Sequence, residues 1–322
     1  MDHIIILRKC MLNLDYKFKI AFEHPFRRIW KILQVYFSLL GGLYTICQIV
    51  SLRFDSFDKT VFSCCCTWIA CLLIAVCLNI KWILSFTEKI SAKDTEITLK
   101  VGKIEKEKGA VAISTNSAFV TTMTASVISE KSAQGAFQKR YFDGNSNLDV
   151  LIRDSLKGEN PVSSLILNDG RKYDVYEIGT MAKIVFDTNR HAYLFALNDI
   201  NGNGQNIQHD IDVVYKSVQK LWNSILEKGH TEPELSIHLV GSGRAGISEA
   251  TKMESYKIIL ESFLACVVNS GSKITDHLNI VVHPKDLSKI DLAEAAEFLK
   301  YKCKYFSSIK QLQNGQGGTP VS

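Results

Sequence analysis

Two kinds of hydrophobic pattern follow one another along the 322 residues of the chain. Residues 32–50 and 61–80 are apolar runs without a charged side chain, and each is long enough, as a helix, to cross a hydrocarbon core of ~30 Å. From residue 94 onward, short strand-like runs alternate with longer runs whose apolar residues recur at helical spacing. The pattern predicts two transmembrane helices within 32–86, at about 32–50 and 61–80, and then an α/β domain over 94–305.

A packed core and a signal peptide both fit the two apolar runs less well than a membrane hairpin. A buried core helix accounts for one such run, but two in tandem with a connector of only ten residues are unusual in a packed core. A cleaved signal peptide does not fit either, because the first run is too long and begins too far from the N-terminus. We therefore expect a two-helix membrane hairpin.

Basic residues are concentrated before the first apolar run. Residues 1–31 contain seven Lys and Arg residues against three acids, whereas the connector 51–60 contains two of each sign. Three further lysines follow the second run, at Lys81, Lys89 and Lys93. Because flanks with an excess of Lys and Arg stay cytoplasmic, we expect 1–31 to be a basic cytoplasmic segment and both termini to face the cytoplasm. Later residues contain no comparable basic run, so no nucleic-acid surface is predicted.

Five of the nine cysteines lie in the second apolar run, three of them consecutively at Cys64–Cys66. Neither His nor an acid lies among them, and their spacing matches no common zinc site. Free cysteine behaves as a small apolar residue. We therefore interpret these side chains as apolar filling of a membrane helix, leave palmitoylation open, and predict no metal site.

Alternating strands and helices make up the α/β domain. The predicted strands are 96–101, 110–114, 174–178, 182–186, 191–197, 235–240 and 278–282. The predicted helices are 131–142, 146–157, 206–227, 249–268 and 290–302. The strands within 174–197 read as hairpin neighbours and the later ones alternate with helices, so the sheet should be mixed. The segment 306–322 ends in a polar, Gly-rich stretch, and we expect it to be a flexible tail.

A G-x-G-x-x-G motif occurs late in the chain, at Gly241, Gly243 and Gly246. In a dinucleotide-binding fold this motif opens a βαβ unit, and an acid ends the next strand about 20 residues later. Here Glu261 lies at that distance but inside a helical pattern, and only one more strand follows. The motif therefore does not indicate NAD-dependent redox chemistry. A glycine loop before a helix N-terminus still suits a phosphate or diphosphate, with a ligand-free tight turn as the alternative.

Four short stretches occur in an order that resembles a macro domain, the α/β/α module that binds ADP-ribose. They are Ser114–Phe119, Ser129–Phe137, Tyr176–Met181 and Leu239–Ile247. The resemblance implies a macro-like three-layer α/β/α domain with a mixed sheet. It also implies an Asn that faces the distal ribose and two glycine-containing loops that clasp the two phosphates. The ligand-binding residues implied in this way are Asn116, Ser132, Ala133, Gln134, Gly135, Phe137, Thr180, Met181, Gly241, Ser242, Gly243, Arg244, Ala245, Gly246 and Ile247.

The sequence departs from the macro pattern at two places. Lys103 follows Gly102 where macro domains usually have the acid that holds the adenine amine. The first glycine loop reads Ser-Ala-Gln-Gly and has no acid nearby to position a water molecule. Of the histidines, His238 lies within a predicted strand and His283 just after one, where a core or edge role is expected. We therefore predict a binding protein and not an enzyme, with no catalytic residue and no cofactor besides its nucleotide ligand.

With two membrane spans in front of this domain, the chain resembles the transmembrane–macro effectors of Thoeris antiphage systems, the ThsA type with a macro domain. The resemblance implies a multi-pass protein of the bacterial inner membrane. A TIR-domain partner would make an ADP-ribose-derived signal, and the resemblance suggests the histidine-linked form. Binding would lead to homo-oligomerisation, disruption of the lipid bilayer and abortive infection. The alternatives are a membrane-tethered ADP-ribosyl hydrolase and an ADP-ribose-binding module that forms no pore.

Overall fold

The chain forms two compact units, Met1–Phe86 and Thr87–Ser322. The computed structural model describes residues 25–53, 65–82, 85–90, 94–123, 127–142, 147–168, 170–207, 209–228, 231–241, 251–270 and 272–315.

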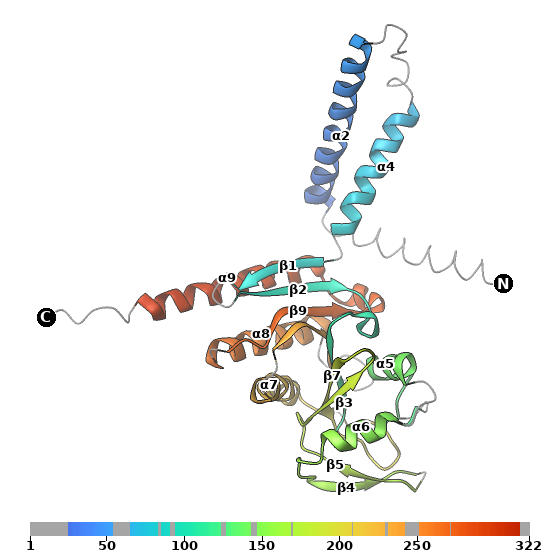
Figure 1. Ribbon diagram of the computed structural model, residues 1–322, viewed down its shortest axis with the longest axis vertical. Helices are drawn as coiled ribbons and strands as arrows, with labels where there is room; N and C mark the ends of the chain where they lie inside the picture. The colour runs from blue at the N-terminus through green and yellow to red at the C-terminus, as the bar shows by residue number, and fades with distance from the viewer. Residues whose placement is uncertain are drawn as a thin grey trace, which may run out of the picture. The chain divides into compact units, whose positions relative to one another are not determined.

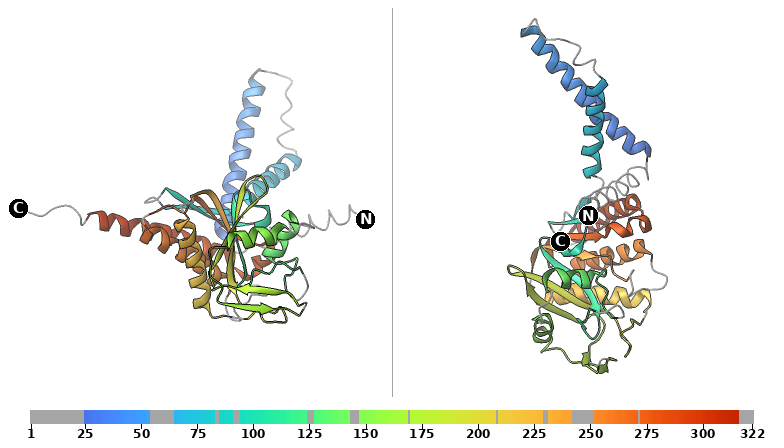
Figure 2. Two further views of the ribbon diagram at one scale, coloured as in Figure 1. Left: turned by 60° about the horizontal axis from the view of Figure 1, so that its bottom comes forward. Right: turned by 90° about the vertical axis from the view of Figure 1, so that its right-hand side faces the viewer.

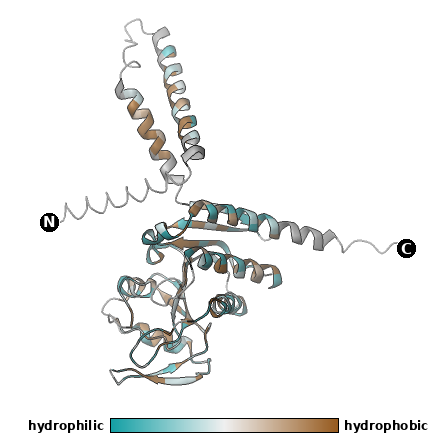
Figure 3. Cartoon of the chain, turned by 180° about the vertical axis from the view of Figure 1, so that it is seen from behind, coloured by the Kyte–Doolittle hydropathy of each residue, from teal (hydrophilic) through white to brown (hydrophobic). Residues whose placement is uncertain are grey.

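The described residues of the first unit include two helices that contact each other, α2 (Pro25–Arg53) and α4 (Cys65–Trp82) (Figure 1). The predicted span 32–50 lies within α2, and the predicted span 61–80 overlaps α4, with residues 61–64 outside the described parts. Many of their large apolar side chains are exposed, and Figure 3 shows the apolar character of α4. Within the described residues, no helix combines the length and the apolar character that a membrane crossing requires. The membrane hairpin stays a prediction from the sequence.

The second unit is built on a seven-stranded sheet with the order β1-β2-β9-β8-β3-β7-β6 (Figure 1). Strands β2, β9, β8, β3 and β7 are parallel to one another, and β6 is antiparallel to β7. The predicted mixed sheet is therefore confirmed. The strands are β1 (Ser85–Ile90), β2 (Thr95–Val101), β3 (Ala110–Asn116), β6 (Met181–Phe186), β7 (Arg190–Asn198), β8 (Glu232–His238) and β9 (Thr275–Val282).

Helices cover both faces of this sheet (Figures 1 and 2). On one face, α5 (Ala133–Tyr141) and α6 (Asn147–Ser155) share a core with β3, β6 and β7. On the other face lie α7 (Ile211–Glu227), α8 (Lys252–Ser270) and α9 (Leu292–Gly315). Two short 3-10 helices, η1 (Ile104–Lys106) and η2 (Pro284–Lys289), follow β2 and β9.

Burial on both faces explains the hydrophobic composition of the central strands. All residues of β7 from Ala192 to Asn198 are buried, as expected for a parallel strand between two helical layers. Across the α7–α8 interface, the indole N–H of Trp222 donates to Ser262 Oγ at 2.9 Å, and its ring meets Phe263 edge-on. Burial of one such large side chain contributes about 1.5–3 kcal/mol.

The structure differs from the sequence-based expectation at four places. The predicted strand 174–178 is replaced by β5 (Lys172–Val175), which pairs with β4 (Ser163–Ile166) in a separate two-stranded antiparallel sheet. The sequence pattern does not predict β4, because its side chains are mostly exposed and give no apolar signal. α9 continues to Gly315, beyond the expected domain end at 305. Strand β1 lies partly within the segment predicted as the membrane hairpin.

Candidate functional site

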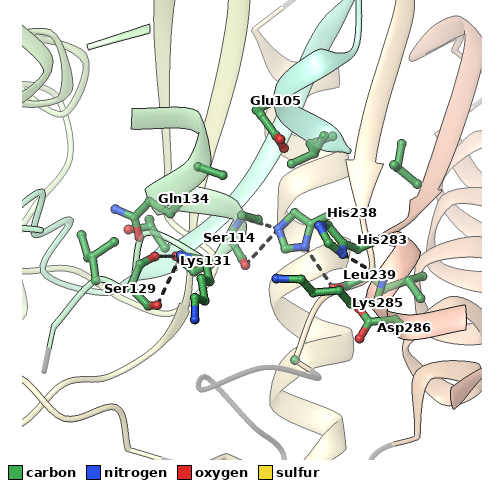
Figure 4. A pocket seen from close by; sticks show the side chains of 18 of the residues that line it. Glu105, Ser114, Ser129, Lys131, Gln134, His238, Leu239, His283, Lys285 and Asp286 are labelled. Atoms are coloured by element: carbon green, nitrogen blue, oxygen red, sulfur yellow. Dashed lines mark hydrogen bonds between the residues drawn. The ribbon is translucent and has the colours of Figure 1, made fainter. Parts of the chain in front are cut away.

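A cavity of about 540 Å³ lies at the carboxyl ends of the parallel strands (Figure 4). Its wall includes Asn116 of β3, Asn198 of β7, His238 of β8 and Val281 of β9. In open α/β sheets, ligands bind outside the carboxyl ends of the strands, where successive connections pass to opposite faces of the sheet. This cavity occupies such a position.

The strands β3 and β8 separate at this point. They pair over three residues, from Ala110–Leu235 to Ala112–Ile237. Beyond Ala112, β3 stays with β7 and β8 stays with β9. The chain then leaves β3 toward α5 on one face and leaves β8 toward α8 on the other. The divergence of the two strands makes the floor of the cavity.

Asn116 ends β3 and is held in one orientation. Its Oδ1 accepts a hydrogen bond from the backbone N–H of Val120 at 3.1 Å, which closes a turn in which Phe119 has a φ of 48°. Among the described residues, none accepts a hydrogen bond from its Nδ2 group. Asn116 therefore presents an amide donor at the cavity, which suits a hydroxyl or phosphate oxygen.

The N-terminus of α5 forms one wall of the cavity. Ser132 caps the helix: its Oγ accepts from the N–H of Gly135 at 3.0 Å and donates to the carbonyl of Ser129 at 2.7 Å. The cavity lining includes Ala133 and Gln134, and the first N–H groups of a helix have no partner within it. This end of the helix also carries partial positive charge and attracts anions.

Glycine at position 135 is required by packing. A Cβ atom there would lie 2.1 Å from the carbonyl oxygen of Ser129. Gln134 is tied to the segment that follows β3, because its Nε2 donates to the carbonyl of Val120 at 3.1 Å. Hydrogen bonds thus connect the segment after β3, the Ser129 loop and the cap of α5 into one wall.

Two neutral histidines, His238 and His283, line the cavity, and Figure 4 labels both. Burial lowers the pKa of His238 to about 4. Burial also lowers the pKa of His283, whose Nδ1 accepts from the N–H of Lys285 at 3.1 Å and caps η2. Each ring accepts a hydrogen bond from a backbone N–H, as only an unprotonated nitrogen can.

A buried ion pair joins α8 to η2 at the same wall. The ammonium of Lys252 lies 2.9 Å from a carboxylate oxygen of Asp286, and the lysine side chain is 8% exposed. Among the described residues that line the cavity, four are lysines and two are acids, namely Lys131, Lys252, Lys285, Lys289, Glu105 and Asp286. The excess of cations favours an anionic ligand. Within the described residues, no group of three or more metal-ligating side chains is present.

The structure brings together part of the predicted site. Five of the predicted ligand-binding residues line the cavity, and they come from a strand end, a helix N-terminus and the start of the late glycine loop. They are Asn116, Ser132, Ala133, Gln134 and Gly241.

Other predicted residues lie elsewhere or outside the described residues. Gly135 is not among the residues that line the cavity; its lack of a side chain lets α5 pack against the carbonyl of Ser129. Phe137 is fully buried in the core, where its ring meets Phe186 at a centroid distance of 5.0 Å. Thr180 and Met181 are not among the residues that line the cavity, and Met181 is buried at the start of β6. Six predicted residues of the glycine loop lie outside the described part of the chain: Ser242, Gly243, Arg244, Ala245, Gly246 and Ile247.

Several residues of the cavity wall are not predicted by the sequence pattern. Sequence position favours a core or edge role for His238 and His283, yet both line the cavity. Lys252 and Asp286 are 34 positions apart, and only folding pairs them. The available signal was the position of these residues near the ends of predicted strands or at a helix start, because parallel strands bring their ends to one edge of the sheet.

An open α/β sheet with a cationic cavity at the carboxyl ends of its parallel strands defines a domain suited to nucleotide-like anions. The sequence model of the family described as the Macro domain of the Thoeris protein ThsA matches residues 97–283. The match covers more than half of the chain, and the protein belongs to this family. Comparison with curated proteins finds no match.

Solved macrodomain structures resemble the chain at low sequence identity. The Oceanobacillus iheyensis macrodomain with MES bound is 14% identical, with a TM-score of 0.45, over 68% of this chain and 98% of that chain. The same macrodomain with ADP is 14% identical, with a TM-score of 0.40, over 68% and 97%. The Trypanosoma brucei macrodomain in complex with ADP-ribose is 12% identical, with a TM-score of 0.40, over 60% and 66%.

Proposed function

We propose that the cavity binds an ADP-ribose-type nucleotide signal, and that this protein is the membrane effector of a Thoeris antiphage system. The observation that carries the proposal is the α5 N-terminus beside Asn116, in a cavity with excess cationic side chains, in a chain of the ThsA macro family. Helix N-termini and lysines together favour a diphosphate.

Each part of the ligand has a proposed partner. The diphosphate lies between the α5 N-terminus and the glycine loop that starts at Gly241, whose φ of 73° suits glycine. The amide of Asn116 binds the distal ribose. Glu105 lines the cavity near Gly102 and supplies a carboxylate for the adenine amine, in place of the acid that Lys103 replaces.

We propose binding without turnover. Among the described residues that line the cavity, the acids are Glu105 and Asp286. The second is paired with Lys252, and the imidazole of His238 is engaged by the backbone on both nitrogens. A general base needs a free lone pair near the substrate. This arrangement therefore supports recognition of the signal and not its hydrolysis.

The proposed output is disruption of the inner membrane by assembled hairpins. Support comes from the uncharged run 32–50 and from apolar side chains exposed on both helices, such as Phe37 (63%) and Leu73 (60%). Exposed apolar surface of this extent needs a lipid or protein partner. A TIR-domain protein would supply the signal, and the signal must bind the assembled state more tightly than the resting one.

Calorimetric titration of the full-length protein with ADP-ribose and with its histidine conjugate tests the binding proposal. The sharpest variant is Ala133→Glu, with Ala133→Gln as a matched neutral control. A carboxylate in the first turn favours the helix but repels a diphosphate, so Ala133→Glu should weaken binding at least about tenfold more than Ala133→Gln. Equal affinities for the two variants would remove the α5 N-terminus from the site.

Two further measurements separate the proposed effector from other functions. Dye release from lipid vesicles that carry the full-length protein should require the nucleotide. Release that never occurs, although the ligand binds, would indicate a binding module without pore activity. Steady release of ADP-ribose from an ADP-ribosylated substrate would instead indicate a hydrolase.

A further inference from the structure

His238 lies where β3 and β8 separate, and its ring spans the gap between them (Figure 4). Its Nε2 accepts a hydrogen bond from the backbone N–H of Ser114 at 3.3 Å and lies 3.2 Å from the Oγ of the same residue. Its Nδ1 lies 3.0 Å from the carbonyl oxygen of Leu239. The side chain of His238 thus contacts the backbone of Ser114 in β3 and the backbone of Leu239, the next residue in sequence.

The two backbone contacts determine the tautomer of the ring. A backbone N–H can only donate and a carbonyl oxygen can only accept. The Nδ1 atom must therefore carry the proton, and Nε2 must offer its lone pair to Ser114. A protonated ring would place a second N–H against the N–H of Ser114. Burial of the ring also disfavours an imidazolium at this position; the ammonium of Lys252 acts in the same direction and the carboxylate of Asp286 opposes it.

The pairing register shows what the imidazole replaces. Continued pairing of β3 with β8 beyond Ala112 and Ile237 would bring Ser114 opposite Leu239. The N–H of Ser114 would then find a carbonyl of β8, as buried backbone donors must find some acceptor. Instead the ring accepts this bond, and the carboxyl ends of the two strands stay apart.

We propose that His238 is a positioning residue that keeps β3 and β8 apart and thereby holds the ligand cavity open. The identity of the ligand rests on the proposed function. The role of His238 in separating the two strands does not depend on it. His238 acts as a neutral spacer with one donor and one acceptor, and it gives Ser114 a partner without the strand pairing that would narrow the cavity.

The test compares His238→Leu with His238→Gln in the full-length protein. Leucine keeps an apolar body of similar size but has no acceptor, whereas glutamine retains an acceptor oxygen. We expect His238→Leu to weaken ADP-ribose binding about tenfold, the effect of one lost buried hydrogen bond, and His238→Gln to stay within about threefold of the unmodified protein. A residue important only for folding would lower the melting temperature without this difference in affinity. Equal affinity of His238→Leu and the unmodified protein would overturn the proposal.

A second measurement does not need the ligand. A structure of His238→Leu should show the N–H of Ser114 bonded to a carbonyl of β8 and a narrower cavity. An unchanged separation of the strands would overturn the proposal even if ADP-ribose is not the ligand. Failure of the unmodified protein to bind ADP-ribose, with the strands closer in His238→Leu, would instead reject the proposed ligand and retain the role of His238.

Discussion

The ammonium group of Lys252 lies 2.9 Å from a carboxylate oxygen of Asp286 and joins the first residue of α8 to η2 at the cavity wall. A cation at a helix N-terminus opposes the helix dipole, so Lys252 alone would disfavour the start of α8. Asp286 offsets this repulsion, and together the two residues position the start of α8, which follows the glycine loop.

Removal of one partner of this pair should destabilise the domain. Lys252→Met leaves the carboxylate of Asp286 partly buried without its cation, and we expect the free energy of unfolding to fall by about 1–3 kcal/mol in urea titrations. The exposed pair Lys157–Asp154 provides a control, and Lys157→Met should change stability by less than about 1 kcal/mol. Equal effects of the two substitutions would contradict the structural role of the buried pair.

Gly135 should tolerate no larger side chain. Gly135→Ala places a methyl group against the carbonyl of Ser129, and we expect a loss of about 1–3 kcal/mol or more, as in other overpacked sites. A methyl group at Gly158 would have no atom within 4 Å, so Gly158→Ala should be close to neutral. Thermal unfolding of both variants checks the difference, and a neutral Gly135→Ala would show that the Ser129 loop moves easily.

Phe137 should behave as a core residue and not as a ligand contact. Its ring is fully buried against Phe186 and Tyr141, so Phe137→Ala should cost about 3–5 kcal/mol. The milder Phe137→Leu should lower stability while ADP-ribose affinity of the folded protein stays unchanged. Loss of affinity in a stably folded Phe137→Leu protein would return this residue to the binding site.

Stability should depend on pH through His238. Burial lowers its pKa in the folded protein from 6.5 to about 4, so between these values the unfolded chain binds more protons than the folded one. The free energy of unfolding should therefore fall as the pH decreases from about 6.5 toward 4. His283 contributes with the same sign. In His238→Gln this fall should be smaller, and an identical slope in urea titrations across this pH range would show that folding does not lower the pKa of His238.

Most elements of the α/β domain could be predicted from the sequence, because strands such as β7 are buried on both faces and keep a continuous apolar pattern. β4 could not, because it is short and exposed. In the candidate site, the resemblance to macro domains implied Asn116 and Ser132, and both line the cavity, at the end of β3 and at the N-cap of α5. The motif does not show that Phe137 lies in the core and outside the cavity lining, because neighbouring positions in a helix point to different faces.

The sequence by itself determined the alternation of strands and helices, the glycine positions and the family resemblance, since these depend on local spacing and residue type. Only the tertiary structure decided which strands are neighbours, that β3 and β8 separate after Ala112, and that His238 faces Ser114 across the gap. Those contacts join residues more than a hundred positions apart. Their geometry follows from the packing of both helical layers on one sheet, which no local pattern encodes.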